Sequence, residues 1–127
     1  MDILAGSRDV SLRRMIGHAL KGAGNRVETT AKSSVLLVEI LDRDFDLVIL
    51  DTDLEGIDGQ ETFRLLRQMR PKIPMVFLHR KTEDLTSIAG AGEGSVVLLD
   101  RTAGEAALVR AVEETTVKAG MGRTSQG

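Results

Sequence analysis

A short apolar run between two aspartates constrains the fold of this chain more than any other feature. Residues 47–50 (Leu-Val-Ile-Leu) stand between Asp46 and Asp51. Four residues are too few for a helix, and their unbroken apolar character is typical of a strand covered on both faces of a parallel sheet. Similar runs occur at residues 3–5, 75–78 and 96–99, and a fainter candidate surrounds Val27. The sequence therefore predicts five short strands.

Between these runs the apolar residues take the spacing of helices. One stripe covers residues 12–20, with Asp9 as its expected N-cap, and others cover residues 63–70, before Pro71, and 108–112. Residues 33–43 fit a strand or a helix, and we favour a helix because parallel strands need a crossover connection. Residues 82–90 predict at most a weak helix. The resulting order, β-α repeated five times, predicts an α/β fold with a doubly wound parallel sheet and helices on both faces.

Length and composition narrow the class of protein. A chain of 127 residues forms one domain, and zero cysteines exclude disulfides and cysteine-bound metals. Three phenylalanines, no tryptophan or tyrosine and a net charge of −2 argue against nucleic-acid binding. No apolar run approaches the ~18 residues of a membrane span. We therefore expect a cytoplasmic domain over residues 1–119, with residues 120–127 as a flexible tail or the start of a linker.

The candidate site lies where the strands end. In open α/β sheets, ligands bind beyond the carboxyl ends of the strands. The chemically capable residues that follow the predicted strands are Ser7, Arg8, Asp9, Asp51, Asp53, His79 and Arg101.

Residues 46–59 (Asp-Leu-Val-Ile-Leu-Asp-Thr-Asp-Leu-Glu-Gly-Ile-Asp-Gly) resemble the third-strand signature of response regulator receiver domains, the CheY-like family. The opening Asp-Ile-Leu and the Ile-Pro-Met-Val-Phe-Leu of the fourth strand are similar to the same family, and the likeness extends from residue 2 to about residue 117. The resemblance implies a flavodoxin-like sheet of order 2-1-3-4-5. It also implies self-phosphorylation, in which an aspartate takes a phosphoryl group from a histidine kinase.

The resemblance assigns the phosphoacceptor position to Asp51. In the family, Mg²⁺ is held by that aspartate and by two acids after the first strand, where this chain has Ser7 and Arg8. A threonine or serine ends the fourth strand in the family, where His79 stands here. The family lysine after the fifth strand corresponds to Arg101 when counted back from Leu108, or to Leu98 when counted forward from Gly94.

These departures change the charge of the expected pocket. The family's three acids sum to −3, which Mg²⁺ reduces to −1, whereas Asp51 and Arg8 sum to zero and Mg²⁺ would leave +2. We therefore expect no metal site, with Asp9 as a poor substitute ligand. Our hypothesis is that Arg8 takes the place of the metal and pairs with Asp51.

Other residues carry plainer expectations. Asp53 and Asp58 are typical of loop turns, and His18 is expected on the surface. A basic strip beside the third helix is expected to be a solvated face, and it comprises Arg64, Arg67, Arg70 and Lys72. Gly90, Gly92 and Gly94 precede a strand rather than a helix, so they are not a dinucleotide loop and are expected to loosen the region of the fourth helix.

Three functions remain open from the sequence. The first is a pseudo-receiver of a two-component phosphorelay, with a degenerate pocket, which binds a histidine kinase or an effector through the face of its fourth helix, fifth strand and fifth helix. The second is a working phosphoacceptor, which would catalyse no more than its own phosphorylation and dephosphorylation at Asp51. The third is an unrelated enzyme or small-ligand binder on the same fold. A homodimer through the fifth-helix face is compatible with the first two.

Overall fold

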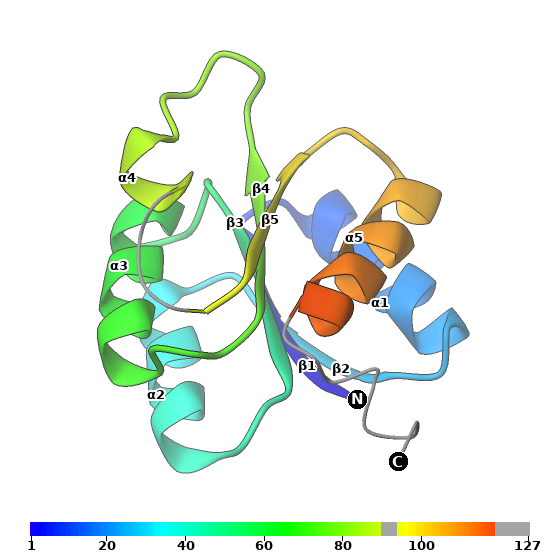
Figure 1. Ribbon diagram of the computed structural model, residues 1–127, viewed down its shortest axis with the longest axis horizontal. Helices are drawn as coiled ribbons and strands as arrows, with labels where there is room; N and C mark the ends of the chain where they lie inside the picture. The colour runs from blue at the N-terminus through cyan, green and yellow to red at the C-terminus, as the bar shows by residue number, and fades with distance from the viewer. Residues whose placement is uncertain (90–93, 119–127) are drawn as a thin grey trace.

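The computed structural model, which describes residues 1–89 and 94–118, places five parallel strands in a single sheet (Figure 1). The strands are β1 (Asp2–Gly6), β2 (Arg26–Thr30), β3 (Leu47–Asp51), β4 (Met75–His79) and β5 (Val96–Asp100). Their order across the sheet is β2-β1-β3-β4-β5. This arrangement confirms the predicted fold class and strand order.

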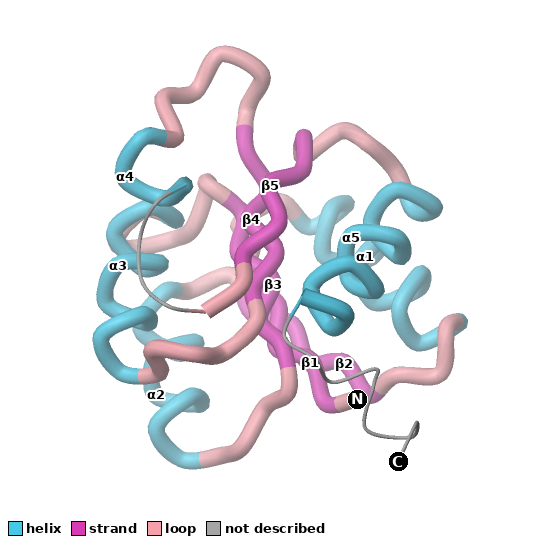
Figure 2. Tube along the Cα trace, viewed as in Figure 1, coloured by secondary structure: helices cyan, strands magenta, loops and turns pink. Residues whose placement is uncertain are grey.

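Helices cover both faces of the sheet, as Figures 1 and 2 show. The helices α1 (Val10–Gly22) and α5 (Glu105–Lys118) lie on one face. On the other lie α2 (Ser33–Asp42), α3 (Gly59–Met69) and the single turn α4 (Thr86–Ala89). The ambiguous segment 33–43 is thus a helix, as predicted, and the weak segment 82–90 contributes only four helical residues.

Local chemistry fixes where the long helices begin. Asp9 caps α1, because its carboxylate accepts hydrogen bonds from the backbone amides of Ser11 and Leu12. Asp58 caps α3 in the same way, accepting from the Glu61 amide at 2.9 Å. Both caps lie at the edge of the sheet where the strands end. The first turns of α1 and α3 are therefore held beside the candidate site.

Alternating residues of the central strands supply two hydrophobic cores. One face packs against α1 and α5, and its strand residues are Ile3, Ala5, Leu47, Ile49, Val76, Leu78 and Val97. The other packs against α2 and α3, and its fully or nearly fully buried strand residues are Leu4, Val48, Leu50, Met75 and Phe77. Every residue of β3 is buried, which is what the unbroken apolar run predicts for a central strand.

Some sequence expectations fall outside the described residues. The predicted tail of residues 120–127 does, as do Gly90 and Gly92, so the boundary after residue 119 stays a prediction. Within residues 1–89 and 94–118, none of the helices has the length and apolar character needed to cross a membrane.

Candidate functional site

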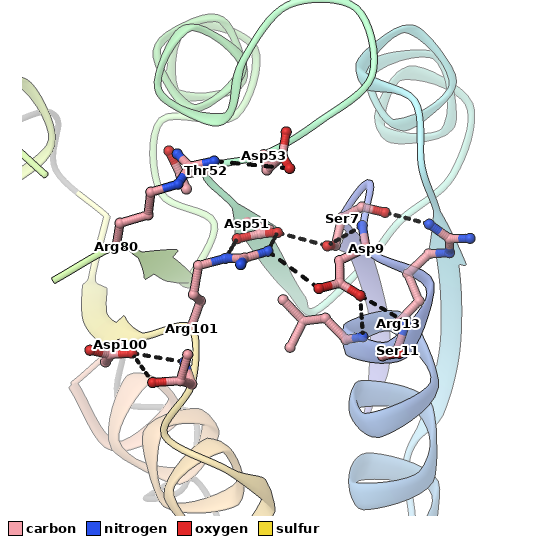
Figure 3. Close-up of polar contacts among 12 residues, drawn as sticks. Ser7, Asp9, Ser11, Arg13, Asp51, Thr52, Asp53, Arg80, Asp100 and Arg101 are labelled. Carbon is pink, nitrogen blue, oxygen red and sulfur yellow. Dashed lines mark hydrogen bonds and ion pairs between the residues drawn. The ribbon is translucent and has the colours of Figure 1, made fainter.

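Asp51 ends β3 and forms the centre of the site. Its side chain is fully buried, with 0% exposed. Arg101 binds it side-on through two hydrogen bonds, from Nε to Oδ1 at 3.0 Å and from Nη2 to Oδ2 at 2.8 Å. Figure 3 shows the arginine reaching from the loop after β5 across the strand ends to the aspartate. This paired geometry is the strongest form of a guanidinium–carboxylate contact.

Ser7 supplies the third hydrogen bond to Asp51. Its hydroxyl is buried and donates to Oδ2 at 2.7 Å. The same hydroxyl accepts the backbone N–H of Asp9 at 3.1 Å, which orients it. Both carboxylate oxygens of Asp51 are thus engaged by groups of this chain.

Arg101 is the only cation that the structure pairs with Asp51 among the described residues. Its side chain is 21% exposed, and its Nη2 also lies 3.7 Å from Oδ2 of Asp9. The hydrogen bond to Asp51 raises the pKa of Arg101 above its ordinary value, although partial burial opposes this, and the charges of Asp51, Asp9 and Asp53 add to the rise. The backbone N–H of Arg101 donates to the carbonyl of His79 at 2.9 Å, which fixes the start of the loop.

The hypothesis that Arg8 pairs with Asp51 is wrong. Arg8 is exposed, and its backbone N–H donates to the carbonyl of Asp53 at 2.8 Å. Neighbouring residues at the end of β1 point to opposite sides of the chain, so when Ser7 faces Asp51, Arg8 faces solvent. Arg101 pairs with Asp51 instead, so the formal charge of the arginine–aspartate pair is still zero, as it would be with Arg8.

The geometry also separates the two candidates for the family's lysine position. Leu98 lies within β5, paired with Phe77 of β4 and packed against the second core. Arg101 directly follows β5 and contacts Asp51. Counting back from Leu108 therefore gives the residue that contacts Asp51, and counting forward from Gly94 does not.

The donor set does not fit Mg²⁺. Magnesium prefers several oxygen ligands, chiefly carboxylates and water, yet the described residues contain no group of three His, Cys, Asp or Glu side chains arranged to hold a metal. Arg101 engages Asp51, and Asp9 Oδ1 caps α1. Asp51, Asp9 and Arg101 sum to −1, so Mg²⁺ would leave +1. At about 4 Å the guanidinium would repel the ion by several kcal/mol at an effective dielectric of about 20.

The remaining predicted residues border the site without joining Asp51. Asp53 lies 3.9 Å from Nη2 of Arg80 in a partly exposed ion pair. The ring of His79 is half-buried, and its Nδ1 lies 2.9 Å from the backbone oxygen of Arg80. His18 is on the surface, as predicted, 3.7 Å from Glu105.

Gly59 explains why a glycine follows Asp58 in the motif. A Cβ atom at this position would lie 2.2 Å from the backbone oxygen of Asp51, a distance that no real contact allows. The Gly59 N–H donates to the carbonyl of Thr52 at 2.8 Å. The start of α3 therefore packs directly on the backbone around Asp51 and holds it in place.

Sequence reasoning missed a brace formed by Glu83 in the loop between β4 and α4. Its carboxylate accepts from Thr52 Oγ1 at 2.6 Å, from Gln60 Nε2 at 2.7 Å and from the Arg80 N–H at 3.0 Å. Partial burial favours the neutral acid, but the hydrogen bonds from Gln60, Thr52 and Arg80 outweigh it and lower the pKa of Glu83. No signal in the sequence marked this residue, because the segment 82–90 has no clear periodicity.

The basic strip of α3 is not uniformly solvated. Arg64 is exposed and pairs with Glu61. Arg67 is only 6% exposed and donates to the backbone oxygens of Ile73 and Ser95, with its Nε left without a partner. Burial lowers the pKa of Arg67. The prediction is therefore wrong for Arg67, which joins α3 to the start of β5.

Comparisons with known proteins agree with this fold. The family model described as "Response regulator receiver domain" matches residues 8–113. The chain is 33% identical over 94 residues to the KDP operon transcriptional regulatory protein KdpE of Escherichia coli, covering 74% of this chain and 41% of that protein. It is 30% identical over 87 residues to the transcriptional regulatory protein AfsQ1 of Streptomyces coelicolor, covering 68% of this chain and 38% of that protein.

The chain thus spans about two fifths of the length of these two curated relatives. Among solved structures, the chemotaxis protein CheY4 of Vibrio cholerae superposes with a TM-score of 0.79 at 24% identity, covering 90% of this chain and 97% of that one. At that level of identity, the match supports the fold alone.

Proposed function

The chain belongs to the response regulator receiver domain family, and from this premise we propose that it is a pseudo-receiver. It is a signalling module of a two-component system in which Arg101 holds the phosphoacceptor position, Asp51, in one state. It works by protein contact without phosphorylation. Family membership favours this proposal over an unrelated enzyme or small-ligand binder on the same fold.

One observation carries the proposal: both oxygens of a fully buried Asp51 are already bonded within the chain. A phosphoryl donor must reach one of those oxygens, and phosphoryl transfer depends on positioning and on neutralising oxygen charge. Here Arg101 and Ser7 occupy the carboxylate. To free a carboxylate oxygen, the pair with Arg101 must break, which leaves the buried charge of Asp51 unpaired and costs several kcal/mol. The carboxylate is therefore a poor nucleophile in this arrangement.

The pair also links the site to the proposed output surface. Arg101 begins the loop between β5 and α5, and Asp51 ends β3 in the centre of the sheet. Their contact fixes that loop relative to the sheet. A histidine kinase or an effector in the cytoplasm would then meet the face of α4, β5 and α5 in a constant conformation.

The decisive experiment is an amide NMR titration with Mg²⁺ and then with beryllofluoride, which mimics the acyl phosphate of an aspartate. We expect no shifts centred on Asp51 in the wild-type chain. Asp51→Asn is the control for nonspecific effects, and Arg101→Lys tests whether the family's own cation restores a response. Wild-type shifts that vanish in Asp51→Asn would overturn the proposal.

One observation favours a working phosphoacceptor as the second candidate. The acceptor aspartate and a cation at the lysine position are both retained, and Asp9 lies 3.7 Å from that cation. If Arg101 swung toward Asp9, Oδ1 of Asp51 would be freed for phosphorylation, while Oδ2 would keep its bond from Ser7. Magnesium-dependent phosphorylation of the wild type, absent in Asp51→Asn, is the result that this candidate requires.

A further inference from the structure

Helix α2 carries an apolar stripe on its outward side. Val35, Val38 and Leu41 follow one another at intervals of three residues and are 41%, 54% and 62% exposed. The opposite side of the same helix buries Leu36 and Ile40 in the core. Seven large apolar residues are exposed in the described parts of the chain, and three of them lie on this one helix. Exposed apolar residues gathered in this way mark contact surfaces.

The charged residues that α2 itself carries at its two ends are opposite to those that stabilise a single helix, although Arg70, the C-cap of α3, donates to the Ile40 carbonyl at 2.8 Å and offsets this in part at the C-terminal end. The positive end of a helix dipole favours acids and the negative end favours bases. Yet Lys32 stands at the N-cap without a side-chain cap, the first turn has no acid, and the last turn has no base. Asp42 ends the helix and Asp44 follows it. The C-cap residue Arg43 lies between these two aspartates, but it also pairs with Glu28 and Glu39, so it offsets only part of their charge.

These end charges become favourable when a second α2 lies antiparallel to the first, because the basic end of each helix then lies beside the acidic end of the other. We propose that the outward face of α2 binds a second copy of this chain about a two-fold axis at Val38. The axis sets Val38 against Val38 of the second copy and Val35 against Leu41 of the second copy. It also brings the end with Lys32 beside the end with Asp42 and Asp44. The contact is self-complementary, as a two-fold interface must be.

The surface relief and the charges agree on this occupant. A shallow depression of about 210 Å³ lies on the stripe, lined by Ser34, Val35, Val38 and Glu39. It can receive an aliphatic side chain of the second copy. Glu55 lies beside Lys32 through a backbone bridge, so the charge contribution is modest and the apolar residues supply most of the affinity.

The expected dimer is weak. Each copy contributes three apolar side chains, whereas each partner in a standard interface contributes roughly 20–30 residues. We expect a dissociation constant of roughly 10–500 μM, in the range of transient contacts. The inference is independent of whether Asp51 is phosphorylated, because the stripe lies on α2 and not on the α4-β5-α5 face.

Sedimentation velocity of the 127-residue chain over a range of concentrations tests this proposal. Val38→Glu puts two like charges at the axis and should weaken the dimer at least about tenfold. The matched control is Val10→Glu, because Val10 is 51% exposed on α1, and it should leave the dimer unchanged. Far-UV circular dichroism confirms that each variant is folded.

Charge exchange separates dimerisation from helix stability. Lys32→Glu and Asp42→Lys each improve the charges for an isolated α2, yet each should weaken the dimer. The double variant should restore the dimer. A wild type that stays monomeric up to about 1 mM would overturn the proposal. So would a Val38→Glu dimer as tight as wild type, equal weakening by Val10→Glu, or no recovery in the double variant.

Discussion

Removing Arg101 should destabilise the chain chiefly by leaving Asp51 buried and charged. Breaking a buried ion pair from one side costs about 3–5 kcal/mol. Arg101 is 21% exposed, so water reaches part of the pair and we expect a smaller loss in the free energy of unfolding, about 2–3 kcal/mol for Arg101→Met. For a chain of this size, that loss lowers the melting temperature by roughly 8–15 °C.

A double-mutant cycle tests the cause of this loss. Asp51→Asn removes the buried charge and leaves Arg101 to reach water, so it should cost about 1 kcal/mol. In the double variant no charge is buried, so the loss from Arg101→Met should largely disappear. The expected coupling energy is about 2 kcal/mol.

Urea unfolding followed by far-UV circular dichroism measures all four proteins. The chain has no tryptophan or tyrosine, so fluorescence would report little. A coupling below about 0.5 kcal/mol would refute the reasoning, because it would mean that Asp51 is solvated or held by another group once Arg101 is gone.

Four further substitutions test the surroundings of the site. Gly59→Ala should lower the free energy of unfolding by more than about 2 kcal/mol, because the added Cβ meets the Asp51 carbonyl. Gly17→Ala should raise it by about 0.5–1 kcal/mol through helix propensity, because nothing lies within 4 Å of the added Cβ. Thermal melts measure both variants. Ser7→Ala should cost about 1–2 kcal/mol in urea unfolding, since it removes a buried hydrogen bond to a charged group. The folded-state pKa of Glu83 is lowered, so its stabilisation is present above the unfolded pKa and is lost as pH falls through the folded value. Glu83→Gln should therefore be less stable than wild type at pH 7 by under about 1 kcal/mol, and urea titrations over falling pH should show the two converge; a constant gap would contradict this.

The backbone was predictable because its signals are local. The apolar run before Asp51 indicated a buried strand, and Asp9 was predicted as the N-cap that it is. Asp58 was expected only as a turn residue, and the structure shows that it caps α3. The choice of a helix for 33–43 needed a topological argument, because its apolar residues face both the core and solvent. Its outward residues Val35 and Val38 explain why periodicity alone was ambiguous.

The site was only partly predictable because its key contact is long-range. Asp51 and Ser7 followed from strand ends, but the choice between Arg8 and Arg101 depends on which side of the chain each faces. Arg8 was favoured because it stands where the family has a metal-binding acid, whereas Arg101 lies 50 positions after Asp51 and reaches it only in the folded sheet. The Glu83 brace and buried Arg67 likewise depend on packing between elements, which leaves no periodic signal.

The short length of α4 has a consequence for how this domain opens. A helix of four residues is not stable on its own in water. It is instead fastened to α3 by Gln60, which bonds Glu83, Ser87 and the backbone of Asp84. Glu83 also accepts a hydrogen bond from Thr52, the residue after Asp51. We therefore expect α4 to unfold and refold together with the Thr52–Glu83 hydrogen bond. Hydrogen exchange at Ile88 would then report, from a distance, on the state of the strand end that holds Asp51.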